Sequence, residues 1–83
     1  MLKSYRIFFM AKDVECQIIV KAKNYEEAKD QLFELVKDKN LSGLYYKSLD
    51  SDDLRDAESY IKENRICRED IKRTQKLEND EWI

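Results

Sequence analysis

The sequence lacks histidine and proline and contains a single glycine, Gly43. Without histidine, the commonest general base near neutral pH is missing, and Ser-His and Cys-His nucleophile pairs are excluded. Loops that bind phosphate, of the P-loop or dinucleotide type, are excluded because they need several glycines. No segment has the composition of a flexible linker, so we expect one rigid domain spanning residues 1–83. A catalytic function is therefore not expected.

Long apolar runs are also missing. No stretch approaches the roughly 20 apolar residues that cross a bilayer, so no membrane span is predicted. The N-terminal apolar run is interrupted by Arg6 and lacks a small-residue cleavage site, which argues against a signal peptide. Cys16 and Cys67 are far apart and match no metal-ligand spacing. We predict a cytoplasmic protein with two reduced thiols and no cofactor, with a Cys16–Cys67 disulfide as the alternative.

Alternation of apolar and polar residues between Tyr5 and Ala22 predicts an antiparallel β-hairpin. If Lys12 and Asp13 form its turn, residues 11, 9, 7 and 5 face residues 14, 16, 18 and 20. One side of the hairpin is then consistently apolar and is expected to lie on the core. Its members are Tyr5, Ile7, Phe9, Val14, Cys16, Ile18, Val20 and Ala22.

The other side of the hairpin is mixed. Phe8, Met10 and Ile19 lie there among charged and polar side chains. One interpretation is that another element of the chain packs on this side. The other is that the three residues form a patch that binds a partner, because an isolated apolar patch on a small protein is often an interface.

Two helices are predicted after the hairpin. Asn24 has the side chain of an N-cap, and Glu27 follows three residues later, so a helix is expected over residues 25–38. Gly43 is expected to interrupt the helical run, and residues 44–49 are expected to form a third strand. A second helix, capped by Asp50 or Ser51, is predicted to bury Leu54, Ala57 and Ile61.

The segment after Asn64 has two interpretations. Ile66, Cys67 and Ile71 have the spacing of a helix start, with a cap and a hydrophobic staple, which favours a third helix over residues 68–77. Ile71 and Leu77 also fit a two-residue period in "DIKRTQKLE", so a strand is the alternative. At the C-terminus, Trp82 and Ile83 are expected to pack on the body of the domain.

Acidic residues are concentrated at the start of the second predicted helix. Asp50, Asp52, Asp53 and Asp56 could surround a divalent cation, but they lack the D-x-D-x-D-G loop of known calcium sites. Acidic residues in a first helical turn have a sufficient structural explanation in the helix dipole. We predict no metal site, and we consider this acidic surface as a second candidate for partner binding.

The following segment is basic. Helix 54–64, a turn and a helix 68–77 would form a helix-turn-helix whose second helix presents Arg68, Lys72, Arg73, Gln75 and Lys76 to nucleic acid. The net charge of −2 and the thin apolar stripe of the second helix argue against this hypothesis.

The segment "KSYRIFFMAKDVECQIIVKAKNYEEAKDQLFELV", Lys3 to Val36, is a hairpin followed by A-x-N-x-E-E-A at a helix start. In this arrangement it resembles small accessory proteins of phages and mobile elements, among them anti-defence inhibitors of the anti-CRISPR type. The resemblance covers less than half of the chain and concerns architecture. It implies a small, often acidic binder that inhibits a host nucleic-acid machine, and it transfers no functional residue.

The sequence therefore predicts an α+β domain in which the N-terminal hairpin and a third strand are covered by two or three helices. Its predicted function is non-catalytic binding to a larger protein partner, through Phe8, Met10 and Ile19 or through the acidic residues of the second helix. Nucleic-acid binding by residues 54–77 is the alternative.

Overall fold

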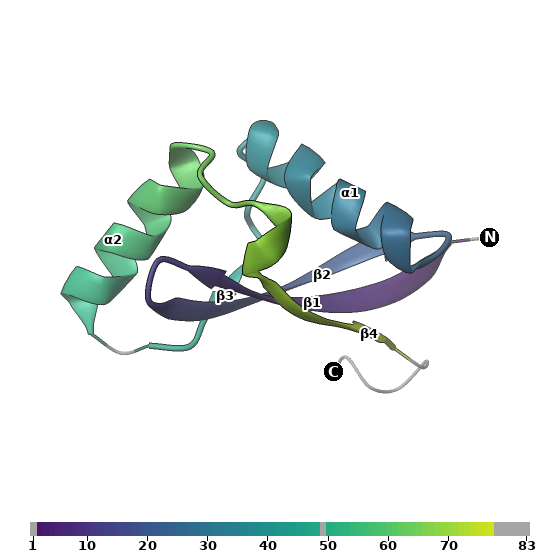
Figure 1. Ribbon diagram of the computed structural model, residues 1–83, viewed down its shortest axis with the longest axis horizontal. Coiled ribbons are helices and arrows are strands. Elements are labelled where there is room, and N and C mark those ends of the chain that lie inside the picture. The colour runs from purple at the N-terminus through teal and green to yellow at the C-terminus, as the bar shows by residue number, and fades with distance from the viewer. Residues whose placement is uncertain (1, 49, 78–83) are drawn as a thin grey trace.

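The computed structural model of the chain describes residues 2–48 and 50–77. These residues form a two-layer α+β fold (Figure 1). One layer is a four-stranded antiparallel sheet with the strand order β3-β2-β1-β4. The other layer contains two helices, α1 and α2, which lie on the same side of the sheet. The predicted α+β class and N-terminal hairpin are confirmed, whereas the predicted third strand and the number of helices are matched only roughly.

The hairpin consists of β1 (Lys3–Ala11) and β2 (Val14–Ala22), and it has the predicted register. Phe9 pairs with Cys16 and Ile7 pairs with Ile18. Lys12 adopts a left-handed conformation in the turn, with φ of 59°. All eight residues predicted to face the core are buried. This face was predictable because a register shift of one residue would have turned every one of these side chains to solvent.

Helix α1 (Tyr25–Lys37) covers the apolar side of the hairpin. Asn24 caps it as predicted, because its side chain accepts a hydrogen bond of 2.8 Å from the Glu27 N–H. Ala28, Leu32 and Val36 recur at helical spacing and are buried against the sheet. Helix α1 is therefore held by its apolar stripe and its cap.

The connection after α1 differs from the prediction. The helix ends at Lys37, and the chain reverses where Lys39 adopts a left-handed conformation with φ of 57°. Gly43 has no positive φ and does not end the helix. The predicted third strand is reduced to β3 (Tyr45–Tyr46), which pairs with Cys16 and Gln17 at the edge of the sheet.

Helix α2 (Ser51–Lys62) lies at the hairpin-turn end of the sheet (Figure 1). Asp50 caps it by accepting hydrogen bonds from the backbone N–H groups of Asp52 and Asp53, at 2.9 and 3.0 Å. Ala57 and Ile61 are fully buried in the common core, as the apolar spacing predicted, whereas Leu54 is half-buried.

The preferred prediction of a third helix over residues 68–77 is wrong. A single 3₁₀ turn, η1 (Arg68–Asp70), is followed at once by strand β4 (Ile71–Lys76), which pairs with β1. The predicted cap at Cys67 is present, because the Cys67 N–H donates a hydrogen bond to the Asp70 carboxylate at 3.0 Å. The helix does not continue because pairing with the free edge of β1 satisfies the backbone and brings Ile71 to the core.

Residue Lys72 forms a bulge in β4. Arg73 pairs with Phe8 and Ile71 pairs with Phe9, so Lys72 is the extra residue between two pairs. The bulge lets Ile71 pack against the core while the exposed Lys72 stays in solvent. The expected packing of Trp82 and Ile83 lies outside the described residues.

Candidate interaction surface

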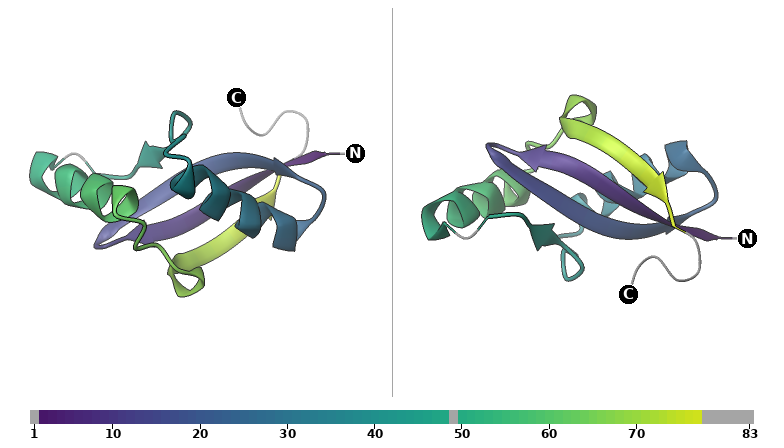
Figure 2. Two further views of the ribbon diagram at one scale, coloured as in Figure 1. Left: turned by 90° about the horizontal axis from the view of Figure 1, so that it is seen from above. Right: turned by 90° about the horizontal axis from the view of Figure 1, so that it is seen from below.

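The sheet has one side that no described helix covers. We call it the open face, and it is visible from below in Figure 2. Side chains alternate along a strand and directly paired residues share a side, so the strand register defines its members. They are Ser4, Arg6, Phe8 and Met10 of β1, Glu15, Gln17, Ile19 and Lys21 of β2, Tyr45 of β3, and Arg73 and Gln75 of β4.

The open face brings together residues from two sites that the sequence predicted separately. Phe8, Met10 and Ile19 share it, as their spacing indicated. Arg73 and Gln75, which were assigned to a nucleic-acid-binding helix, lie opposite Phe8 and Arg6 because β4 is a strand. One surface therefore contains both apolar and basic side chains.

One row of side chains crosses all four strands. Tyr45 pairs with Gln17, Gln17 with Phe8, and Phe8 with Arg73. The guanidinium carbon of Arg73 lies 4.2 Å from the centroid of the Phe8 ring, which is cation–π geometry. At the opposite end of the row, the Tyr45 side chain is 58% exposed.

The apolar residues of the open face differ in how much surface they offer. Phe8 is only 9% exposed and lies under Arg73, so it offers less contact area than the sequence suggested. Met10 and Ile19 are half-buried. Tyr45 was missed in the sequence, where the alternation of residues 44–49 was too weak to assign it to a side.

The strand positions of the open face carry more positive than negative charge. Arg6, Lys21 and Arg73 are basic, and Glu15 is the one acidic member. Glu15 forms an ion pair with Lys47 at 3.3 Å, so its charge is compensated locally. The helix layer has the opposite sign, because α1 and α2 each contain two more acidic than basic residues.

The predicted acidic surface lies on α2, away from the open face. Asp50 is engaged as the helix cap, and Asp52 pairs with Arg55 at 2.9 Å. Asp53 is exposed, and Asp56 pairs with Lys12 of the hairpin turn at 3.7 Å. Among residues 2–48 and 50–77, no group of three or more acidic or cysteine side chains is arranged to hold a metal ion.

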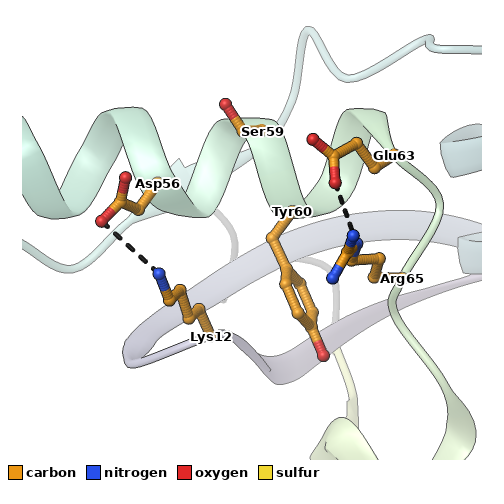
Figure 3. Close-up of a pocket in the computed structure, with 6 residues that line it drawn as sticks. All are labelled: Lys12, Asp56, Ser59, Tyr60, Glu63 and Arg65. Atoms are coloured by element: carbon orange, nitrogen blue, oxygen red, sulfur yellow. Dashed lines mark ion pairs between the residues drawn. The ribbon is translucent and has the colours of Figure 1, made fainter.

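A shallow hollow of about 240 Å³ separates α2 from the hairpin turn (Figure 3). The Lys12–Asp56 ion pair borders it on one side, and the Arg65–Glu63 pair, at 2.8 Å, borders it on the other. Tyr60 lies between the two pairs. The charged side chains that line the hollow are thus already paired with one another.

The five residues of the alternative nucleic-acid site are dispersed. Arg68 forms ion pairs with Glu26, at 3.4 Å, and with Asp30 on α1, and its guanidinium lies 5.9 Å from the centroid of the Phe33 ring. Lys72 is in the bulge, and Lys76 pairs with Tyr5 on the core side of the sheet. Only Arg73 and Gln75 reach the open face. Residues 54–77 do not form a helix-turn-helix, because the predicted second helix is a 3₁₀ turn followed by strand β4.

Both cysteines are free thiols, and both are poorly ionised. Burial raises the pKa of the Cys16 thiol to about 12. Cys67 is exposed, but hydrogen bonding to the side chains of Glu69 and Asp70 raises its pKa to about 11. Because the thiolate is the nucleophilic form, neither thiol is suited to nucleophilic catalysis near neutral pH.

Comparison of the chain with protein-family models, with curated proteins and with solved structures finds no match in any of the three. Within the described part of the chain, no helix is long and apolar enough to cross a membrane.

Proposed function

We propose that this protein is a non-catalytic binding module and that the open face is its contact surface for a larger protein partner. The observation that supports the proposal is the gathering of Met10, Ile19 and Tyr45 around the Phe8–Arg73 pair, on the side of the sheet that no described helix covers. Aromatic residues, Met and Arg are the residue types enriched in protein interfaces.

The rigid placement of the residues on the open face supports a function in binding in preference to catalysis. The open face is the side of a paired sheet, so its residues are held at fixed positions by the strands beneath them. Rigid placement reduces the entropy lost when a partner binds. The partner we propose to test first is a host nuclease complex of the defence type, as the architectural resemblance implies. The two free thiols support a reducing, cytoplasmic location.

Affinity capture tests the proposal. The protein is immobilised, incubated with nuclease-treated host cytoplasm, and the retained proteins are identified. The double variant Met10→Ser and Ile19→Ser removes apolar contact area from half-buried positions, and we expect a loss of capture of roughly tenfold or more. Leu2→Ser is the matched control, because Leu2 is 56% exposed and precedes β1.

The acidic start of α2 is the competing protein-binding surface. Asp52→Lys with Asp53→Lys reverses its charge without removing the Asp50 cap. Capture that persists in this variant and fails in the Met10 and Ile19 variant supports the open face. The reverse result would reject the proposal and move the contact surface to α2.

Single-stranded nucleic acid is a second candidate ligand of the same surface. Aromatic side chains on a sheet, with basic residues beside them, are the usual platform for stacking bases. Tyr45, Phe8 and Arg73 lie in one row and provide these residue types. A polarisation titration with a labelled oligonucleotide at low salt tests it, because phosphate contacts are strongest there.

A further inference from the structure

The charge distribution of the open face identifies the chemistry of its partner. We infer that the open face binds an acidic segment of a protein, in which carboxylates alternate with apolar side chains. This inference rests on the proposed function and specifies the partner. It follows from three properties of the surface: the basic side chains of β4, the placement of Arg73, and the apolar residues beside it.

The two layers of the molecule differ in sign. Strand β4, at the edge of the open face, contains Lys72, Arg73 and Lys76 and no acidic residue, and Glu15 of β2 is paired with Lys47. The acidic residues of α1 and α2 lie in the other layer, across the core. Within the described residues, basic side chains are therefore concentrated at the β4 edge of the sheet. An acidic partner is attracted to that side.

Arg73 is placed to receive a carboxylate. Its guanidinium stacks on the Phe8 ring, at 4.2 Å from guanidinium carbon to ring centroid. A guanidinium that lies over a ring face can still direct N–H groups away from the ring, to a carboxylate that accepts two parallel hydrogen bonds. Because the stack already restricts the side chain, less entropy is lost on binding.

The neighbouring residues supply the apolar part of the contact. Met10 lies two positions beyond Phe8 on the same strand and the same side, and Ile19 pairs with Arg6 on β2. Apolar partner side chains would pack on Met10 and Ile19 while a carboxylate meets Arg73. A nucleic acid would make less use of these aliphatic groups, which is why an acidic protein segment fits the surface better.

A second copy of the chain is a weaker candidate for this surface. The edge strand β4 contains Lys72, Arg73 and Lys76 and no acidic residue, so two β4 edges would repel each other. Association of the open face with the acidic helices of another copy is the remaining mode. Light scattering on the purified protein detects that mode directly.

The test uses fluorescein-labelled peptides. A peptide of Glu-Glu-Leu-Leu repeats places both residue types on each side of an extended chain. We expect it to bind, and we expect the corresponding Gln-Gln-Leu-Leu peptide to bind at least tenfold more weakly, because a hydrogen bond to a charged group contributes the equivalent of about tenfold in affinity. Binding is expected to weaken between about 0.01 M and about 0.15 M salt.

Variants locate the contact. Arg73→Gln is expected to weaken binding of the acidic peptide roughly tenfold. Arg55→Gln is the matched control, because it makes the same change of charge on the opposite layer, where Arg55 pairs only locally with Asp52. Equal losses of affinity in both variants would mean that only the net charge of the protein matters, and this would overturn the inference.

Two other results would also overturn it. An oligothymidylate that binds more tightly than the peptide would indicate nucleic acid, and a concentration-dependent oligomer would indicate a second copy of the chain.

The two proposals can fail separately. If the Met10→Ser and Ile19→Ser variant loses capture of its partner while Arg73→Gln retains it, the open face is the contact surface but the partner is not acidic. If none of these variants affects capture, the proposed function itself is wrong.

Discussion

The guanidinium of Arg73 stacks on the ring of Phe8, directly opposite it on the neighbouring strand. The contact joins the first strand of the sheet to the last one in the sequence, on the side away from the helices. It also covers Phe8, which is 9% exposed although it lies outside the main core cluster. Arg73 thus has a structural contribution in addition to its place on the proposed contact surface.

A double-mutant cycle measures this contribution. We expect Arg73→Gln and Phe8→Leu to show a coupling free energy of about 0.5–1 kcal/mol, the usual range for an exposed cation–π pair. Chemical denaturation of the two single variants and the double variant gives the value. Lys72→Gln, in the neighbouring bulge, is the control and should show no coupling to Phe8→Leu. A cycle that closes to within about 0.3 kcal/mol would contradict the stacking contribution.

Arg68 is predicted to stabilise the fold and to be dispensable for binding. Arg68→Gln removes its ion pairs to Glu26 and Asp30 and its contact with the Phe33 ring, so η1 loses its link to α1. Because both carboxylates are exposed, we expect a loss of no more than about 1 kcal/mol in the free energy of unfolding. The loss should shrink in high salt.

The control for Arg68 is Arg65→Gln, because Arg65 forms a short-range pair with Glu63 only two residues away. Denaturation at low and high salt compares the two variants, and peptide binding is measured in parallel. A defect in binding without a change in stability would show that Arg68 belongs to the contact surface after all.

The elements that the sequence predicted correctly are those with local determinants. The hairpin register follows from the two-residue alternation of residues 5–22, and α1 follows from the Asn24 cap and the Ala28–Leu32–Val36 stripe. Each of these signals lies within one element or between two adjacent ones. The placement of Phe8, Met10 and Ile19 on one side of the sheet followed from the same alternation.

The last strand was mistaken for a helix because its local signals are ambiguous. A capped start at Cys67 is compatible with a helix and with one 3₁₀ turn, and only Ile71 and Leu77 are apolar in the segment that follows. What decides the structure is pairing with β1, more than 60 positions earlier in the chain, and the bulge at Lys72. The arrival of Arg73 on the open face depends on that pairing and therefore could not be predicted locally.

Lys39 provides a test of the backbone at the end of α1. It adopts a left-handed conformation with φ of 57°, where a residue with a Cβ atom is strained and glycine is not. Its side chain is exposed, and the reversal is closed by backbone hydrogen bonds from the N–H groups of Lys39 and Asn40 to α1. We expect Lys39→Gly to increase the free energy of unfolding by about 0.5–1 kcal/mol.

The matched control is Lys37→Gly, two residues earlier and still inside the helix. The same substitution there should reduce stability by up to about 1 kcal/mol, because glycine is a poor helix former. Thermal or urea unfolding of both variants measures the difference. The two substitutions must change the free energy of unfolding in opposite directions. A Lys39→Gly variant that is less stable than the parent would contradict the assigned conformation.

The reactivity of Cys67 provides a test of the local structure around η1. Hydrogen bonding to Glu69 and Asp70 raises the pKa of this thiol to about 11, although the side chain is exposed. The neighbouring carboxylates favour the protonated thiol, so little thiolate is present near neutral pH. We therefore expect slow alkylation by iodoacetamide, with a rate that continues to rise with pH until it reaches a plateau above about pH 11.

Glu69→Gln should lower the pKa of Cys67 and speed its alkylation near neutral pH. Glu63→Gln, at the C-terminal end of α2, is the control and should leave the rate unchanged. The buried Cys16 is removed from the measurement by Cys16→Ala, and alkylation of Cys67 that is already maximal at neutral pH would show that the carboxylates do not control it.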